Sequence, residues 1–232
     1  MRELGILEPA DRVELIEGHV FDLADRLVNG GVVVSPRESK AMDADPDSWL
    51  PFHRFTVRDY YRMSEIGLLA LEARVELIEG EIIDMTPIGS MHCATVDWIT
   101  ALFHEAVCRR AIVRTQGVVA LSEFSEPQPD IALLKRRDDF YRKAHPRAPE
   151  TLLIVEVSDS SLRTDQRVKI PLFAHFGVPE VWIVDLVNER FHFYRSPRDG
   201  DYTDISFSAK PGLTALSVCP DITVDLSDLF RN

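Results

Sequence analysis

Apolar and polar residues follow two kinds of spacing along this chain, and these predict helices and strands in turn. Amphipathic helices are predicted where apolar side chains recur at helical spacing, at residues 56–65, 91–107 and 164–176. Strands are predicted where β-branched or apolar residues form short runs, at residues 112–121, 131–134, 151–157, 180–186 and 190–194, with a hairpin at 75–85 that turns at Glu79-Gly80. Strands interleaved with helices predict an α/β or α+β domain with a mixed β-sheet.

Particular residues at the ends of these segments and inside them indicate where a helix begins and which strand is central. Thr56 directly precedes the first predicted helix, and threonine is a common helix N-cap. The run at 151–157 holds only two residues that are not apolar, Thr151 and Glu156. Such a run predicts a central strand that is covered on both faces of the sheet.

The segment RVELIEG occurs twice, at residues 12–18 and at 74–80. Two copies are too few for a solenoid, which needs about three stacked repeats. We therefore interpret the first copy as a partial duplicate of the element at 67–85. It is followed by a charged, proline-rich stretch that is typical of a linker. The chain is thus predicted to consist of an N-terminal extension at 1–49 and one main domain at 50–232.

Composition and cysteine spacing narrow the class of protein. At 232 residues and 45% hydrophobic content, the chain can bury one substantial core. The three cysteines, Cys93, Cys108 and Cys219, form neither a Cys-x-x-Cys pair nor a regular framework, which suits a reducing compartment. No charged leader opens the chain, and no apolar run approaches the roughly 20 residues that span a bilayer. We expect a soluble cytoplasmic protein with no membrane partner.

The net charge of −12 counts against a nucleic-acid binder, because lysine and arginine supply most of the affinity for phosphate backbones. The charge is unevenly distributed, however. Residues 1–49 carry a net charge of −6, whereas residues 109–147 hold 9 basic and 5 acidic residues, with aromatic residues among them. The basic segment is either a loop that faces phosphate or an ordinary solvated loop.

Two acidic residues interrupt otherwise apolar strands. Glu156 lies inside the run at 151–157, and Asp130 follows Pro129 directly before the run at 131–134. Burial of an isolated carboxylate costs several kcal/mol, which a divalent cation between two acids would offset. Oxygen ligands on rigid strands suit Mg²⁺ or Mn²⁺. The alternatives are a buried salt bridge from Glu156 to an arginine, and a turn or capping role for Asp130.

A lysine in the next predicted segment is a candidate third member of this site. Lys169 belongs to the helix at 164–176, which is expected to pack beside the Glu156 strand. The alternative is a surface lysine that pairs with Asp165, four residues earlier. Because two buried acids repel each other without a cation, we expect that replacing Asp130 or Glu156 by alanine leaves the metal-free fold no less stable.

Several motifs follow one another in the order of one nuclease family: RVELIEG at 74–80, SMH at 90–92, EPQPD at 126–130, IVEVS at 154–158, DQRVK at 165–169 and GVPEVWIVD at 177–185. From residue 55 onward, the chain resembles the Uma-family restriction endonucleases of the PD-(D/E)xK nuclease superfamily. The resemblance implies a restriction-endonuclease-like fold, in which helices flank a mixed β-sheet. It also implies that Asp130 and Glu156 are ligands of a divalent metal ion.

The chain departs from the superfamily pattern at Ser158, where the catalytic lysine should stand. The resemblance implies that this lysine has moved to the following helix as Lys169, whose long side chain can reach the site. It further implies the Val157 carbonyl as a metal ligand and Glu76 as an additional acid, since Glu76 alternates with apolar neighbours. The alternative for Glu76 is an exposed strand glutamate. His92 either approaches the site from its helix start or packs locally.

These interpretations predict a divalent-metal-dependent endonuclease that hydrolyses DNA, with Mg²⁺ or Mn²⁺ as its cofactor. Endonucleases that cut both strands commonly pair two sites, so we expect a homodimer with residues 187–194 at its interface. One alternative is a nuclease fold without activity that binds DNA or a partner protein. Another is a two-carboxylate glycosidase. Trp49, Trp98 and Trp182 are too scattered in the sequence to favour a sugar cleft.

Overall fold

The computed structural model describes residues 13–16, 19–22, 53–70 and 72–230, and the predicted linker lies outside these residues. The chain divides into two compact units. One unit consists of residues 1–84 and 122–125, and the other of residues 85–121 and 126–232.

Among its described residues, the first unit contains a helix and a β-hairpin that the sequence predicts. Helix α2 (Val57–Glu65) begins after Thr56, whose hydroxyl accepts a hydrogen bond from the Asp59 main-chain N–H at 3.2 Å. The Asp59 carboxylate accepts one from the Thr56 main-chain N–H at 2.9 Å, which completes a capping box. Thr56 is therefore the helix N-cap, as predicted.

Strands β3 (Val75–Ile78) and β4 (Glu81–Asp84) form the predicted hairpin. Its two-residue turn has positive φ at both positions, 51° at Glu79 and 84° at Gly80, as tight hairpins require. Strands β1 (Val13–Ile16) and β2 (His19–Asp22) pair in the same register 62 positions earlier, Val13 with Asp22 as Val75 with Asp84. The repeated sequence therefore forms the same hairpin twice.

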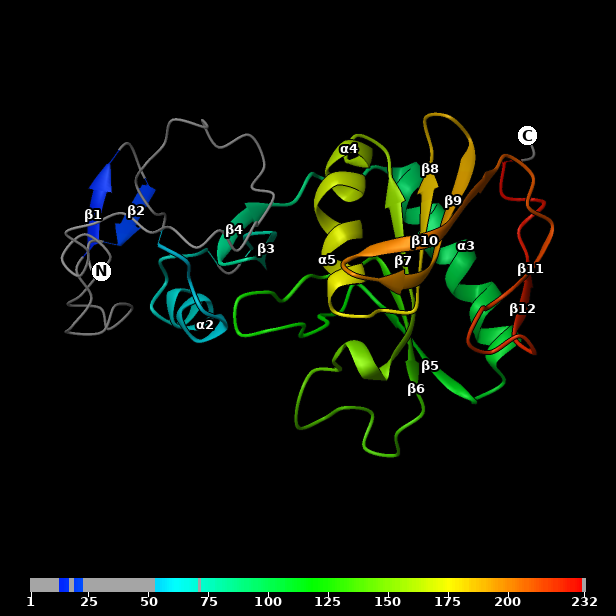
Figure 1. The fold of residues 1–232 in the computed structure, drawn as a ribbon, viewed down its shortest axis with the longest axis horizontal. Helices are drawn as coiled ribbons and strands as arrows, with labels where there is room; N and C mark the ends of the chain where they lie inside the picture. The colour runs from blue at the N-terminus through cyan, green and yellow to red at the C-terminus, as the bar shows by residue number, and fades with distance from the viewer. Residues whose placement is uncertain (1–12, 17–18, 23–52, 71, 231–232) are drawn as a thin grey trace. The chain divides into compact units, whose positions relative to one another are not determined.

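The larger unit is built on a six-stranded sheet in the order β10-β9-β8-β7-β6-β5 (Figure 1). Its strands are β5 (Ala111–Thr115), β6 (Ile131–Lys135), β7 (Thr151–Ser158), β8 (Glu180–Asp185), β9 (Arg190–Arg198) and β10 (Asp201–Ser208). Strands β7 and β8 are parallel, and every other neighbouring pair is antiparallel. The sheet is therefore mixed, as predicted. Two short strands, β11 (Leu213–Ala215) and β12 (Thr223–Asp225), pair separately.

Helices cover both faces of this sheet (Figure 1). Helix α3 (Ser90–Val107) packs on one face, where the Phe103 ring lies 5.7 Å from the ring of Trp182. Helix α5 (Ile170–His175) packs on the other face, where Phe173 is fully buried. Side chains of β7 enter the cores on both faces, which confirms that it is a central strand.

Two strand predictions need correction. The strand expected at 112–121 ends at Thr115, because Gln116 has a φ of 46° and the chain then leaves the sheet. The predicted interface strand at 187–194 is not an edge, since β9 pairs with β8 on one side and β10 on the other. Strand β10 was missed because most of its residues are polar or exposed. A sheet edge therefore lies at β10 and not at residues 187–194.

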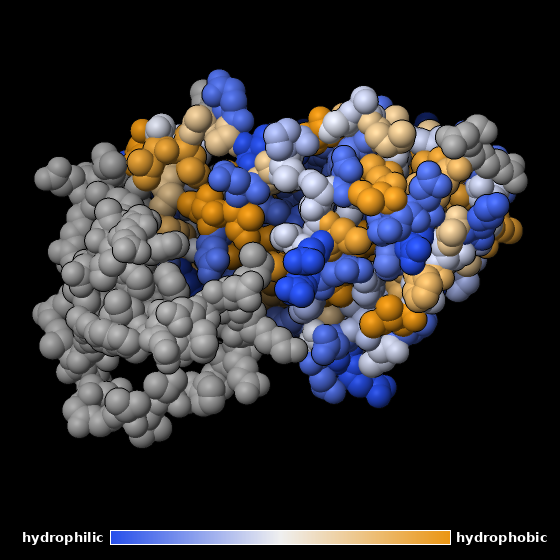
Figure 2. Space-filling view, turned by 90° about the horizontal axis from the view of Figure 1, so that it is seen from above, coloured by the Kyte–Doolittle hydropathy of each residue, from blue (hydrophilic) through white to orange (hydrophobic). Residues whose placement is uncertain are grey.

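Large apolar side chains also remain exposed on the larger unit, among them Val187, Phe207 and Leu213. On the face drawn in Figure 2, hydrophobic residues are interspersed with hydrophilic ones. Scattered exposed apolar residues are ordinary on folded proteins. Within the described parts of the chain, no helix has the length and apolar character needed to cross a bilayer.

Asp185, at the end of β8, links the stability of the fold to pH. Burial acts to raise the pKa of this carboxyl, but Asn188 donates to it from its main chain at 3.0 Å and its side chain at 2.8 Å. With the His192 imidazole 3.6 Å away, these contacts bring the pKa below its ordinary value. The lowered pKa contributes stability that is fully present above the unfolded pKa and is lost as the pH falls through the folded pKa.

We therefore expect Asp185→Asn to be less stable than the unaltered protein near neutral pH. The difference between their free energies of unfolding should shrink as the pH falls below about 4, the ordinary range of an aspartate. Urea denaturation of both proteins near pH 7 and near pH 3 measures this difference. A difference that stays constant with pH would contradict the expectation.

Candidate active site

Asp130 and Glu156 face each other across two neighbouring strands. Strands β6 and β7 pair with Ile131 opposite Val155, and one further step of this antiparallel register sets Asp130 opposite Glu156. Opposed residues of an antiparallel pair project to the same face of the sheet. Both side chains are buried, with exposed fractions of 8% for Asp130 and 4% for Glu156. The structure thus brings together the two acids that the sequence singled out.

Hydrogen bonds hold the Asp130 carboxylate against the end of β7. Its Oδ2 atom accepts from the Val157 main-chain N–H at 2.8 Å and lies 3.1 Å from Nε2 of His92. Its main-chain carbonyl accepts from the N–H of Gln116 at 2.8 Å. Among the described residues, Oδ1 accepts no hydrogen bond, so one carboxylate oxygen remains for another ligand. The prediction that His92 approaches this site agrees with the observed distance.

Lys169 points into the same site. Its Nζ atom lies 3.2 Å from Oε1 of Glu156 and 3.9 Å from Oδ1 of Asp165. All three side chains are buried, so the alternative of a surface lysine is wrong, although the contact with Asp165 does occur. Glu156 therefore pairs with a lysine, whereas the alternative interpretation had named an arginine.

A π-helical turn at Asp165–Lys169 joins the short helix α4 (Leu162–Thr164) to α5. The Ile170 N–H donates to the Asp165 carbonyl, five residues earlier. Pro171 accounts for the wide turn, because it has no N–H to donate and its ring displaces the carbonyl four residues before it. π-turns are rare, and many of them lie at functional sites. This local irregularity therefore positions Lys169.

Two serines complete the group that supports the lysine. Ser158 donates its hydroxyl hydrogen to Asp165 at 2.6 Å, and Ser161 donates to the same oxygen at 2.7 Å. Asp165 is thereby held beside Lys169. The sequence showed Ser158 only as the place of a missing lysine, and its role in orienting Asp165 was not foreseen. The four-residue spacing of Asp165 and Lys169 was the available signal for their contact.

Glu76 belongs to strand β3 of the first unit and is 5% exposed. The alternative of an exposed strand glutamate is therefore wrong. Its role as an additional catalytic acid stays a prediction.

The oxygen atoms of this site fit a hard divalent cation. The described residues contain no group of three or more histidine, cysteine, aspartate or glutamate side chains arranged to hold a metal ion. The Val157 N–H points toward Asp130, and the N–H and C=O of one strand residue point to the same side. The Val157 carbonyl therefore lies on the Asp130 side of β7. Two carboxylates and one carbonyl suit Mg²⁺, which usually keeps further positions for water and phosphate.

A second buried acid shows that burial alone does not mark a catalytic residue. Glu180 on β8 is fully buried, and its Oε1 atom accepts from Arg195 at 2.6 Å and from the Trp182 indole at 2.7 Å. Its Oε2 atom accepts from the main-chain N–H and the hydroxyl of Ser217. With both oxygens occupied by protein donors, Glu180 joins the sheet to the C-terminal segment. Asp130, with Oδ1 available, differs in this respect.

A mixed sheet flanked by helices, with paired acids and a buried lysine at the ends of its strands, is a restriction-endonuclease-like arrangement. The chain is similar to a crystal structure described as a putative nuclease belonging to DUF820 from Anabaena variabilis, with a TM-score of 0.57 and 18% sequence identity over 76% of this chain and 97% of that one. A model of the Uma2 family, described as putative restriction endonuclease, matches residues 57–228. The chain therefore belongs to the Uma2 family, which confirms the resemblance. No match was found among curated proteins. Family and fold together indicate a nuclease.

Proposed function

We propose that this protein is a divalent-metal-dependent endonuclease that hydrolyses DNA phosphodiester bonds. The observation that carries the proposal is the buried group at the ends of β6 and β7, in which Asp130 faces Glu156 and Lys169 Nζ lies 3.2 Å from Glu156 Oε1. With Asp165, the group contains three carboxylates and one lysine. In their ionised forms these leave an excess of negative charge, which a divalent cation would offset.

The chain supplies both the metal ligands and the groups that orient them. Asp130, Glu156 and the Val157 carbonyl would hold Mg²⁺ or Mn²⁺. When bound, the ion supplies Lewis-acid chemistry that polarises the phosphate and makes water a stronger nucleophile. Lys169 holds the Glu156 carboxylate in place, and its ammonium offsets negative charge that develops on the phosphate. His92 orients the Asp130 carboxylate through Oδ2.

DNA is the proposed substrate, and because it has two strands, the number of copies of the chain in the active protein matters. Endonucleases that cut both strands commonly pair two sites of this kind, so a homodimer is part of the proposal. Residues 190–194 belong to β9 and pair on both sides, so they offer no free sheet edge at which two copies could join.

A cleavage assay on the full chain tests this function. We expect supercoiled plasmid to be nicked or linearised in Mn²⁺ or Mg²⁺ and to remain intact in chelator, with single-stranded oligonucleotides tested in parallel. Cleavage that persists in chelator would overturn the metal dependence. Binding of DNA without cleavage in either metal would instead match a nuclease fold that lacks activity.

A further inference from the structure

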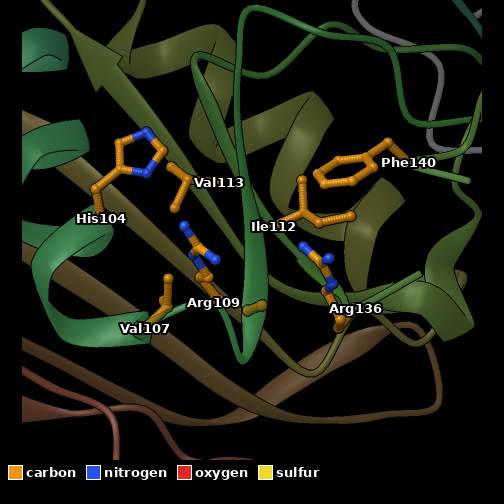
Figure 3. A pocket seen from close by; sticks show the side chains of 8 residues that line it. His104, Val107, Arg109, Ile112, Val113, Arg136 and Phe140 are labelled. Carbon is orange, nitrogen blue, oxygen red and sulfur yellow. The ribbon is translucent and has the colours of Figure 1, made fainter. Parts of the chain in front are cut away.

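A basic pocket of about 550 Å³ flanks the edge strand β5 of the larger unit (Figure 3). The residues that line it come from the end of α3, from β5 and from the loop after β6: His104, Val107, Arg109, Ala111, Ile112, Val113, Arg136 and Phe140. In Figure 3, Arg109 lies with His104 and Val113, and Arg136 lies with Ile112 and Phe140. The two groups reflect the alternation of β5 side chains between the faces of the sheet.

The lining contains two guanidinium groups and an imidazole but no acidic side chain. Within the described part of the chain, Arg109 makes no hydrogen bond or ion pair. Its neighbour Arg110, by contrast, donates to the carboxylate of Asp221. Arg136 stacks over the Phe140 ring at 4.6 Å, and its nearest acid, Asp138, is 4.0 Å away and fully exposed. Guanidinium groups with open donors are suited to bidentate contacts with phosphate.

The backbone holds these side chains in positions that cost free energy. Arg109 and Phe140 have φ values of 67° and 52°, in the left-handed region that L-residues other than glycine rarely adopt. Residues in this region are strained and are often found at functional sites. Tyr141, with a φ of 59°, anchors the loop through a 2.8 Å hydrogen bond from its hydroxyl to the Lys135 carbonyl. The anchored loop leaves Phe140 and Arg136 exposed at the pocket.

The pocket lies at the opposite end of β6 from the two acids. Strand β6 separates Asp130 from Arg136, and six residues of extended chain span about 20 Å. Phosphates of one strand of duplex DNA follow a helical path, so a direct distance of about 20 Å separates phosphates that are several nucleotides apart.

We propose that this pocket binds a backbone phosphate of the DNA substrate, several nucleotides from the phosphate at Asp130 and Glu156. The proposal rests on the proposed nuclease function and adds a second contact with the same strand. Arg109 and Arg136 approach the phosphate from the two sides of the β5 edge, and Phe140 keeps the Arg136 guanidinium in position by stacking.

The salt dependence of DNA binding tests this assignment. Fluorescence anisotropy with a labelled duplex of 30 base pairs, in chelator so that no cleavage occurs, gives the association constant of the full chain at several salt concentrations. For Arg109→Ala/Arg136→Ala, we expect weaker binding and a slope of log K against log salt that is smaller by about 1.8, or about 0.9 for each arginine that no longer neutralises phosphate charge. Arg198→Ala/Lys210→Ala is the matched control, because it removes two exposed basic charges outside the pocket and outside the basic segment at 109–147.

Three results would contradict the assignment of the pocket to a DNA phosphate. These are an unchanged slope in the pocket variant, an equal decrease of the slope in the control, and no DNA binding by the intact protein. Replacement of chloride by inorganic phosphate at constant ionic strength tests whether the pocket binds free phosphate or a phosphate of the DNA strand. Displacement of DNA by millimolar phosphate that is lost in the pocket variant would show that both bind the pocket and would support the proposal. Calorimetric binding of phosphate that leaves the affinity for DNA unchanged would assign the pocket to free phosphate and overturn it. Cleavage in Mn²⁺ is measured separately: its absence would refute the nuclease function, whereas cleavage with an unchanged slope would refute only the pocket.

Discussion

Asp130→Asn and Glu156→Gln should each lower divalent-metal-dependent DNA cleavage by about 10³-fold or more, because a catalytic metal ion contributes several kcal/mol and each 1.36 kcal/mol changes a rate tenfold. Each substitution keeps the shape of the side chain and removes its charge. The amide introduced in place of the Asp130 carboxylate would still accept from the Val157 N–H, and the amide in place of the Glu156 carboxylate would still accept from Lys169, so the fold should persist. The decrease in cleavage should therefore come from weaker metal binding.

Initial rates of plasmid cleavage in Mn²⁺ measure this decrease, and calorimetric titration with Mn²⁺ measures metal binding directly. Asp138→Asn is the matched control, because this acid is fully exposed on the loop after β6 and should stay near the unaltered rate. Cleavage at the unaltered rate by either active-site variant would refute the assignment of that acid. A variant that still bound Mn²⁺ normally but did not cleave would refute its role as a metal ligand.

Lys169→Ala should destabilise the metal-free protein by about 3–5 kcal/mol, the cost of removing one partner from a buried ion pair. The lysine is 6% exposed and lies between Glu156 and Asp165, both of which would remain buried without it. Glu156→Ala should cost less, because Asp165 stays 3.9 Å from the ammonium. The structure thus revises the expectation that replacing Glu156 leaves the metal-free fold no less stable.

Urea denaturation in chelator compares the unaltered protein, Lys169→Ala, Glu156→Ala and the double variant. The double-variant cycle isolates the energy of the pair, because each single variant removes the same contact. Lys143→Ala, which replaces an exposed lysine on another loop, should stay within about 0.5 kcal/mol of the unaltered protein. Mn²⁺ should stabilise Lys169→Ala, since a bound cation takes over part of the charge balance. A cost below about 1 kcal/mol for Lys169→Ala would contradict the buried pairing.

Local features of the fold could be predicted because they depend on neighbouring residues. Helix α2 begins at its predicted cap, and the hairpin turns at Glu79-Gly80, because capping and turn conformation are set within a few positions. The apolar run of β7 identified a central strand, and the acid within it pointed to the candidate site. Strand β10 carried no such signal, because it lies at an edge of the sheet with most side chains exposed. Its pairing depends on β9 rather than on its own composition.

Most helices and strands, the mixed sheet, the nuclease family and the two acids of the candidate site could be read from the sequence. Which side chains contact one another is visible only in the folded chain. The contact of Lys169 with Glu156 depends on a π-helical turn and on how α5 packs against β7, and the pocket that holds Arg109 and Arg136 depends on the register of β5 with β6. The physical reason is that spacing and propensity act over a few residues, whereas contacts between distant segments are set by packing and strand register.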